Sequence, residues 1–139
     1  MLALSALDEG LDALIATQPQ GGLAALERKA ALLTACFIDR VEETCSEYGL
    51  SLVTPRRAAL RGNQVSFAMD DGDQAYAVVQ ALIARGVVGD FRAPDILRFG
   101  FAPIYLRMVD ASDAAEHVAE VLQTREWDQP RFLQRQAVT

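Results

Sequence analysis

The hydrophobic positions of the chain follow two different periods, which predict helices in some stretches and strands in others. Between Leu23 and Gly49 the apolar residues recur in steps of three and four, as on one face of a long amphipathic helix with Gly49 at its C-cap. This stripe consists of Leu26, Ala30, Leu33, Phe37, Val41, Cys45 and Tyr48. Between Gln64 and Met69 apolar and polar residues alternate instead, which predicts a half-buried strand.

Another helix is predicted close to the N-terminus. Its apolar positions are Leu4, Leu7, Leu11, Leu14 and Ile15. Ser5 and Asp8 have the spacing of a capping box, and the helix ends before the breaker-rich linker at residues 18–22. Gly10 inside this helix costs about 1 kcal/mol relative to alanine, so the helix needs packing partners to be stable.

Two further helices are predicted in the second half of the chain. The earlier one is capped by Asp71 or Asp73 and ends at Gly86, and the later one begins with Asp110 as its N-cap. Their inner faces are expected to carry Tyr76, Val79 and Ile83 on the first helix and Ala114, Val118, Val121 and Leu122 on the second. The tail from Thr124 is expected to dock on this domain or on a further one.

The remaining strands are predicted at residues 50–53, 87–91 and 96–101. In the last of them the period of two places Leu97, Phe99 and Phe101 on one face. Arg98 and Gly100 then lie on the opposite face. Together with the helices, these strands predict an α+β two-layer sandwich, a small and mainly antiparallel sheet with helices on one face. Residues 1–20 are expected to form an interdomain helix and linker, and residues 21–139 the small domain.

Arg98 is the candidate binding residue. A strand arginine beside a glycine has open space next to its guanidinium, and a guanidinium can bind a small carboxylate through two parallel hydrogen bonds. The alternative is an arginine at the sheet edge that pairs with Asp90 or Asp95 or is solvated. A cluster of Arg56, Arg57 and Arg61 predicts a solvated turn or contacts with acidic neighbours.

Composition narrows the class of protein. The formal net charge is -6 and the isoelectric point about 4.7, which disfavours nucleic acid and anionic membranes as partners. Cys36 and Cys45 are nine residues apart, too far for a disulfide within one helix, as expected for reduced thiols of a cytoplasmic protein. The lone histidine, His117, predicts a surface side chain and no metal site. Lys29, the sole lysine, has the context of a solvated helix face and is not expected to be catalytic.

Several blocks of the sequence resemble kynureninases, enzymes that use pyridoxal phosphate. The signature block comprises Gly86-Val87-Val88-Gly89-Asp90-Phe91-Arg92-Ala93-Pro94, Ile96-Leu97-Arg98-Phe99-Gly100-Phe101 and Pro103-Ile104-Tyr105. Further matches, in order, are Leu2-Ala3-Leu4-Ser5-Ala6-Leu7, Ala25-Leu26-Glu27-Arg28-Lys29, Leu52-Val53-Thr54-Pro55-Arg56 and Arg61-Gly62-Asn63-Gln64-Val65-Ser66-Phe67. The chain departs from the family pattern at Asn63 and Ala102, where small hydroxyl residues are expected.

The resemblance implies the C-terminal small domain of an enzyme with the aspartate-aminotransferase-like fold. Such enzymes hydrolyse L-kynurenine to anthranilate and L-alanine in tryptophan catabolism, and they are homodimers. Arg98 matches the family arginine that binds the substrate α-carboxylate, whereas Arg92 is expected to support the turn through an ion pair with Asp90 or Asp95. The cofactor lysine and the phosphate-binding loops are expected upstream of Met1. No cofactor is therefore expected on this chain alone.

Three functional hypotheses stay open at this point. The chain is part of a kynureninase, or a non-catalytic truncated module, or the small domain of a related class V aminotransferase or cysteine desulfurase. The run from Phe99 to Tyr105 favours the first over the third. A chain that lacks the cofactor lysine favours the second for the 139 residues by themselves.

Overall fold

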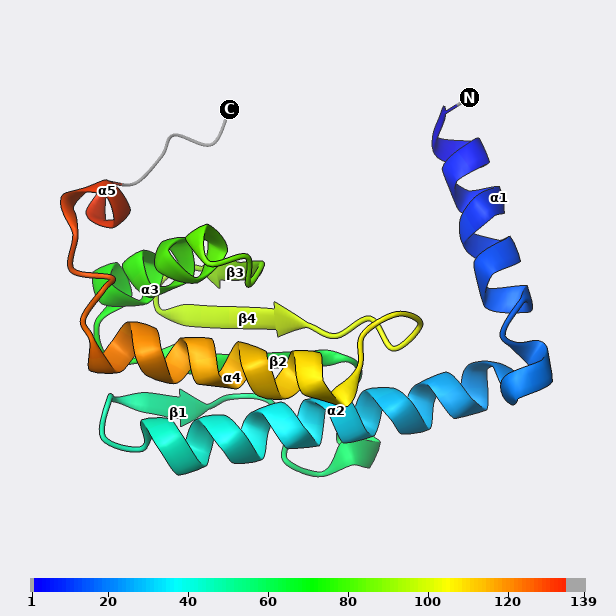
Figure 1. The fold of residues 1–139 in the computed structure, drawn as a ribbon, viewed down its shortest axis with the longest axis horizontal. Coiled ribbons are helices and arrows are strands. Elements are labelled where there is room, and N and C mark those ends of the chain that lie inside the picture. Colours follow the sequence, from blue (N-terminus) through cyan, green and yellow to red (C-terminus); the bar gives the residue numbers. More distant parts are fainter. Residues whose placement is uncertain (1, 135–139) are drawn as a thin grey trace.

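A computed structural model describes residues 2–134 of the chain. In chain order its elements are α1 (Leu2–Ile15), η1 (Gln18–Gln20), α2 (Gly22–Cys45), β1 (Leu50–Leu52), η2 (Ala58–Leu60), β2 (Gln64–Met69), α3 (Gly72–Ala84), β3 (Gly89–Arg92), β4 (Ile96–Gly100), α4 (Met108–Gln123) and α5 (Pro130–Leu133). The four strands form one sheet in the order β1-β2-β4-β3, and each neighbouring pair is antiparallel. Helices α2, α3 and α4 lie on the same side of it (Figure 1). The predicted α+β class is confirmed.

The two faces of the sheet differ in burial because successive side chains point in opposite directions. Val65, Phe67 and Met69 of β2 and Leu97 and Phe99 of β4 are buried under the helices. On the opposite face no helix of the described chain covers the strands, and the side chains there are only partly buried. This arrangement is the predicted sandwich with helices on one face.

An aromatic cluster fixes α2 across the middle of the sheet. The ring of Phe37 lies 4.9 Å from that of Phe99, 5.1 Å from that of Phe101 and 6.3 Å from that of Phe67, measured between centroids. Tilted and edge-on pairs of this kind stabilise a core beyond the area that they bury. Because Phe99 must face Phe37, the strand residue before it must face away from the core. The cluster thereby decides the direction of Arg98.

Several predicted element ends are wrong by a few residues. Helix α2 ends at Cys45, and Gly49 (φ 69°) lies in the turn before β1 rather than at the C-cap. Strand β3 begins at Gly89 instead of residue 87, because the chain turns at Gly86 (φ 87°) and Gly89 N–H bonds back to the carbonyl of Val87 at 3.0 Å. Val87 and Val88, which the sequence pattern placed in the strand, belong to this turn instead.

The predicted helix starts and faces were right only in part. Asp71 caps α3, since its Oδ1 accepts the backbone N–H groups of Asp73 and Gln74 at 2.9 and 3.1 Å. Asp110 is not the N-cap of α4: it is the third helical residue, and its Oδ2 accepts the N–H of Arg107 at 2.6 Å. Of the residues expected on the inner face of α3, Val79 is buried, Tyr76 is partly buried and Ile83 is exposed. The buried residues of this helix are Ala75, Ala77, Val78, Val79, Ala81 and Leu82. Ser5 lies within α1 and does not cap it.

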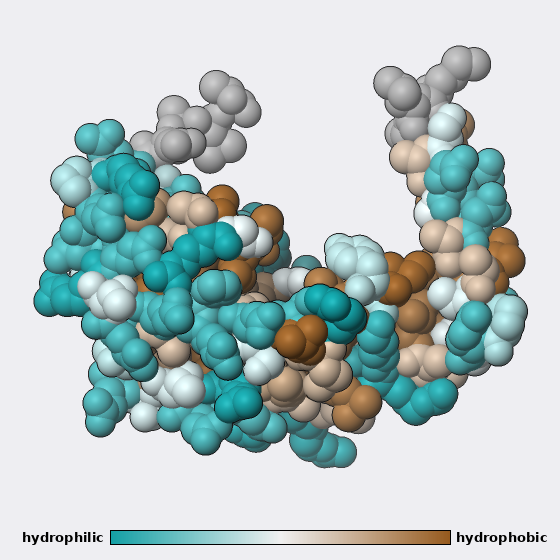
Figure 2. Space-filling model, in the orientation of Figure 1, coloured by the Kyte–Doolittle hydropathy of each residue, from teal (hydrophilic) through white to brown (hydrophobic). Residues whose placement is uncertain are grey.

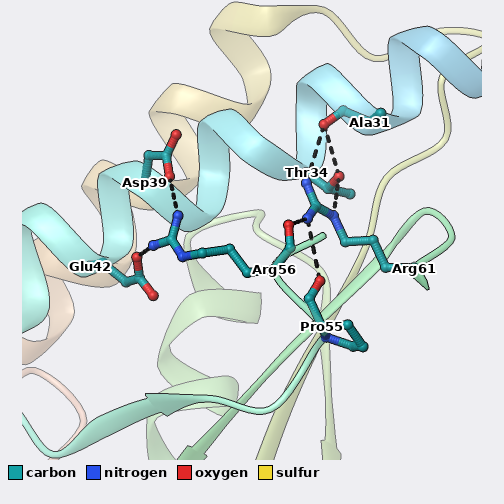
Figure 3. A network of polar contacts seen from close by, with 7 residues as sticks. All are labelled: Ala31, Thr34, Asp39, Glu42, Pro55, Arg56 and Arg61. Atoms are coloured by element: carbon teal, nitrogen blue, oxygen red, sulfur yellow. Dashed lines mark hydrogen bonds and ion pairs between the residues drawn. The ribbon is translucent and has the colours of Figure 1, made fainter. Parts of the chain in front are cut away.

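The loop from β1 to β2 is held against α2 by two arginines (Figure 3). Arg56 forms ion pairs with Asp39, at 2.9 Å, and with Glu42. Arg61 reaches further in: its Nε donates to the hydroxyl of Thr34 at 3.1 Å, and its terminal nitrogens donate to backbone carbonyls. Those carbonyls belong to Pro55, Arg56 and Ala31. The expected contacts of the basic cluster with acidic neighbours are confirmed for Arg56.

The C-terminal segment docks on the same domain. Phe132 of α5 is buried, and α5 packs on α3. Arg85, at the end of α3, forms ion pairs with Glu120 and with Glu126, the latter at 2.6 Å. These hydrogen bonds raise the pKa of Arg85 and lower that of Glu120. The C-terminal segment is therefore held on the domain by the buried ring of Phe132 and by the ion pair of Arg85 with Glu126.

Helix α1 projects from the domain and forms a concave corner with the first turns of α2 (Figure 1). Its apolar side chains are uncovered: Leu4 is 72% exposed and Ile15 62% exposed. Hydrophobic residues gather on the surface around this corner (Figure 2). A groove of about 520 Å³ there is lined mainly by Leu14, Leu23, Leu26 and Ala58. The expectation that this helix finds few partners within the chain agrees with its exposure.

Candidate functional site

The candidate site lies on the uncovered face of the sheet. The strand register places Arg98 of β4 directly between Ser66 of β2 and Asp90 of β3. All three side chains share that face, because residues directly opposite each other in antiparallel strands point the same way. The side chain of Arg98 is 31% exposed, so part of it can be reached from solvent.

Asp90 holds two arginines with one oxygen atom. Its Oδ2 accepts hydrogen bonds from Nη2 of Arg98 and from Nε of Arg92, the latter at 2.9 Å. The expected pairing of Arg92 with Asp90 is confirmed. The alternative considered for Arg98, an ion pair with Asp90, is also present. The three side chains together carry one net positive charge, which suits a single carboxylate ligand.

Open space adjoins this charged group. A Cβ atom built on Gly100, the next residue on the same face, would have no atom within 4 Å. The partner that the structure records for Arg98 within residues 2–134 is Asp90, which takes only Nη2. The two edges of a guanidinium, Nε with Nη2 and Nη1 with Nη2, share Nη2, and Asp90 accepts from only one of its two N–H groups. One edge therefore keeps two parallel N–H donors, which match the two oxygens of a carboxylate. The site can therefore bind an acid without disrupting a core contact.

A backbone hydrogen bond positions the chain at the end of strand β4, and an ion pair follows at the start of α4. Phe101 N–H donates to the carbonyl of Asn63 at 2.8 Å, so the loop clamped by Arg61 continues the pairing just beyond Gly100. After this point the chain enters α4, where Arg107 donates to both carboxylate oxygens of Asp110, at 3.2 and 2.7 Å. These bonds lower the pKa of Asp110 to about 2. The Asp110 carboxylate is thus already paired with Arg107.

The other candidate residues lie elsewhere. Lys29 is half-buried on α2 and lines a groove of about 460 Å³ beside Ala13, Pro103 and Ile104. That lining contains no arginine among the described residues, and Thr17 Oγ1 there already donates to the carbonyl of Leu14. A phosphate-bearing cofactor needs several donors for its phosphate, so the residues present do not fit pyridoxal phosphate.

His117 and the two cysteines do not form a reactive site. His117 lies 3.3 Å, through Nδ1, from Nη1 of Arg85, and its side chain is 38% exposed, as expected for a surface histidine. Cys36 and Cys45 are free thiols, and burial raises the pKa of Cys45. Within residues 2–134 no three acidic, histidine or cysteine side chains are grouped to hold a metal ion. None of the described helices combines the length and apolar character needed to cross a membrane.

Sequence patterns identified only part of this site. The period of two along β4 placed Arg98 and Gly100 on one face. The sharing of Asp90 between Arg92 and Arg98 was missed, because it depends on the register between β3 and β4. The tight spacing of Asp90 and Arg92 at i and i+2 was the available signal, since both then face the same side of a strand.

The fold and the site define a small α+β domain whose open sheet face presents an arginine suited to a carboxylate. The model of the kynureninase C-terminal domain matches residues 26–118. The chain is 45% identical to kynureninases from Burkholderia mallei (strain SAVP1) and Burkholderia pseudomallei (strain K96243) over all 139 residues, which is 32% of the length of each. It is 44% identical to the kynureninase of Pseudomonas fluorescens over 137 residues, 99% of this chain and 31% of that protein.

The chain therefore belongs to the kynureninase family. It spans about a third of the length of the curated relatives it matches. The match to a C-terminal domain confirms the resemblance noted in the sequence. It also favours the first of the three hypotheses over a related aminotransferase or desulfurase.

Proposed function

We propose that this chain is the domain of a kynureninase that binds the substrate carboxylate. The reaction is the hydrolysis of L-kynurenine to anthranilate and L-alanine, a step of tryptophan catabolism. The observation that carries the proposal is the position of Arg98, on the uncovered sheet face next to the open space at Gly100. The ion pair with Asp90 leaves one edge of the guanidinium for the ligand.

The role of Arg98 is to hold and orient the amino-acid end of the substrate. Two parallel hydrogen bonds to the α-carboxylate fix both its position and its plane, which a single point charge cannot do. A reactant held in one orientation loses the entropy of alignment before the bond breaks, and this can lower the barrier by several kcal/mol. Pyridoxal phosphate, when bound in the complete enzyme, supplies the electron sink for carbon–carbon cleavage.

By itself the chain is proposed to be inactive. Its only lysine, Lys29, lies in a groove whose residues do not suit the cofactor. The cofactor and the catalytic groups are then expected from the remaining two thirds of a complete kynureninase. A non-catalytic role for the 139 residues alone is compatible with this division of labour.

The apolar surface at α1 is proposed to contact that remaining part. Leu4, Leu7 and Leu11 are exposed on one stripe of the helix, and uncovered apolar stripes of this kind mark interaction sites. Asp8 and Asp12 border the stripe, which favours a partner surface with basic residues over a nucleic acid or an anionic membrane. We further propose a homodimer as the assembly and the cytoplasm as the compartment, in keeping with the free thiols.

The experiment is a chimera in which this chain replaces the matching C-terminal third of the Burkholderia mallei relative. In the chimera, Arg98→Ala should lower kcat/KM for L-kynurenine by about two orders of magnitude, because a desolvated charged contact to the substrate is lost. Arg98→Lys should recover only part of the activity, because an ammonium group cannot form the planar pair of bonds.

The matched control is Arg92→Ala on the same sheet face. Arg92 contacts Asp90 and is 59% exposed, so its loss should cost less turnover than the loss of Arg98. Thermal melts of all variants separate unfolding from loss of binding. A near-native kcat/KM in Arg98→Ala, or an inactive chimera with the native sequence, would contradict the proposal.

A further inference from the structure

The charge of the candidate site is set by three side chains. Arg98 and Arg92 each contribute a positive charge, and Asp90 bridges them through a single oxygen. Asp90 is 43% exposed and Arg98 31% exposed, so Asp90 stays within reach of any anion bound at Arg98. Ser66, the neighbour of Arg98 on the other side, is uncharged.

We infer that Asp90 is a specificity-determining residue that restricts the site to ligands with a single negative charge. This inference rests on the proposed function, since it concerns the same carboxylate site. A monocarboxylate neutralises the net positive charge of the triad. A ligand with a second carboxylate brings a further negative charge next to Asp90, with no positive charge left to balance it. Asp90 thus rejects dicarboxylates, although it also lowers the affinity for monocarboxylates.

Replacing Asp90 changes the selectivity between monoanions and dianions in a predictable direction, although its effect on the affinity for each ligand alone is not predictable. Replacing Asp90 removes repulsion from the ligand, which strengthens binding, but also frees the guanidinium of Arg98 to move, which weakens it. The second effect is common to both ligand classes and cancels in the ratio of their dissociation constants. The repulsion does not cancel, because a dianion feels it about twice as strongly.

Replacing Arg92 changes the charge of the same site in the opposite direction. Its Nε and Nη2 both lie 2.9 Å from Oδ2 of Asp90. Arg92→Gln removes one positive charge and leaves Arg98 with Asp90, so the site becomes neutral. Dianions should then lose more affinity than monoanions. Two variants on neighbouring strand positions therefore change the same ratio in opposite directions.

The test uses the 139-residue chain and a matched pair of ligands, succinamate with one charge and succinate with two. Their skeletons have the same length, so the comparison isolates charge. Binding is followed by NMR through the Nε–H signal of Arg98 and the β4 amide signals, at low and constant ionic strength because salt screens exposed charges. In Asp90→Asn the ratio of the succinamate to the succinate dissociation constant should shift about fivefold or more in favour of succinate.

In Arg92→Gln the same ratio should shift about as far toward succinamate. The amide spectrum of each variant reports whether the sheet is intact, and both substitutions lie on exposed positions. An unchanged ratio in both variants, with binding still present at Arg98, would overturn the inference and leave the proposed function in place. If neither ligand moves the Arg98 signal of the native chain, the proposed carboxylate site itself is contradicted.

Discussion

Arg61 is predicted to be the main polar contribution to the stability of the loop between β1 and β2. The substitution Arg61→Ala removes the donor to Thr34 Oγ1 at 3.1 Å and the donors to the carbonyls of Ala31, Pro55 and Arg56 (Figure 3). Thr34 is fully buried, and its hydroxyl keeps its own bond to the carbonyl of Ala30 at 2.9 Å. No buried donor is therefore left without a partner, which limits the loss.

The magnitude follows from the number and kind of bonds. A hydrogen bond from a charged group contributes about 1.5–3 kcal/mol, and the half-buried position of Arg61 lets water replace part of this. The expected loss in the free energy of unfolding is about 2 kcal/mol. Arg61→Lys should lose nearly as much, because one ammonium group cannot reach acceptors on both sides of the loop.

The assay is urea unfolding of the chain, followed by the fluorescence of Trp127, the sole tryptophan. Arg57→Ala is the matched control, since it removes an exposed arginine of the same loop and should change stability by less than about 0.5 kcal/mol. A double-mutant cycle with Thr34→Val should give a coupling energy of about 1 kcal/mol. Equal losses in Arg61→Ala and Arg57→Ala would refute the reasoning.

Three further predictions concern other parts of the chain. The isolated chain should self-associate through the exposed stripe of α1, and light scattering should show a smaller species after deletion of residues 1–18; a native monomer at high concentration would contradict this. Asp110 has its pKa lowered from 3.8 to about 2, so its pairing with Arg107 should stabilise the fold above pH 3.8 and be lost as the pH falls through 2; thermal melts in this window should be flatter for Asp110→Asn. Added pyridoxal phosphate should not bind stoichiometrically at Lys29, and a visible absorption band that vanishes in Lys29→Ala would disprove this.

Local sequence patterns predicted the structure correctly where the spacing of apolar residues within one element was sufficient. The stripe of α2 and the alternation of β2 were predicted correctly, because each reflects which side of a single element meets the core. Element ends were less reliable. The turn at Gly86 and the start of α4 at Met108 depend on which hydrogen bonds the flanking residues make, and several are compatible with the same composition.

The alternation along β4 was enough to predict the direction of Arg98, because the apolar residues on either side of it, Leu97 and Phe99, face the core. The block that contains this arginine was also enough to identify the family. The surroundings of the guanidinium, in contrast, depend on how the strands and loops pack together. Asp90 meets Arg98 because β3 pairs with β4 in one register, and Arg61 meets Thr34 because the loop folds back on α2. Such contacts join residues distant in the chain, and their partners are chosen by how whole elements pack together rather than by any local pattern.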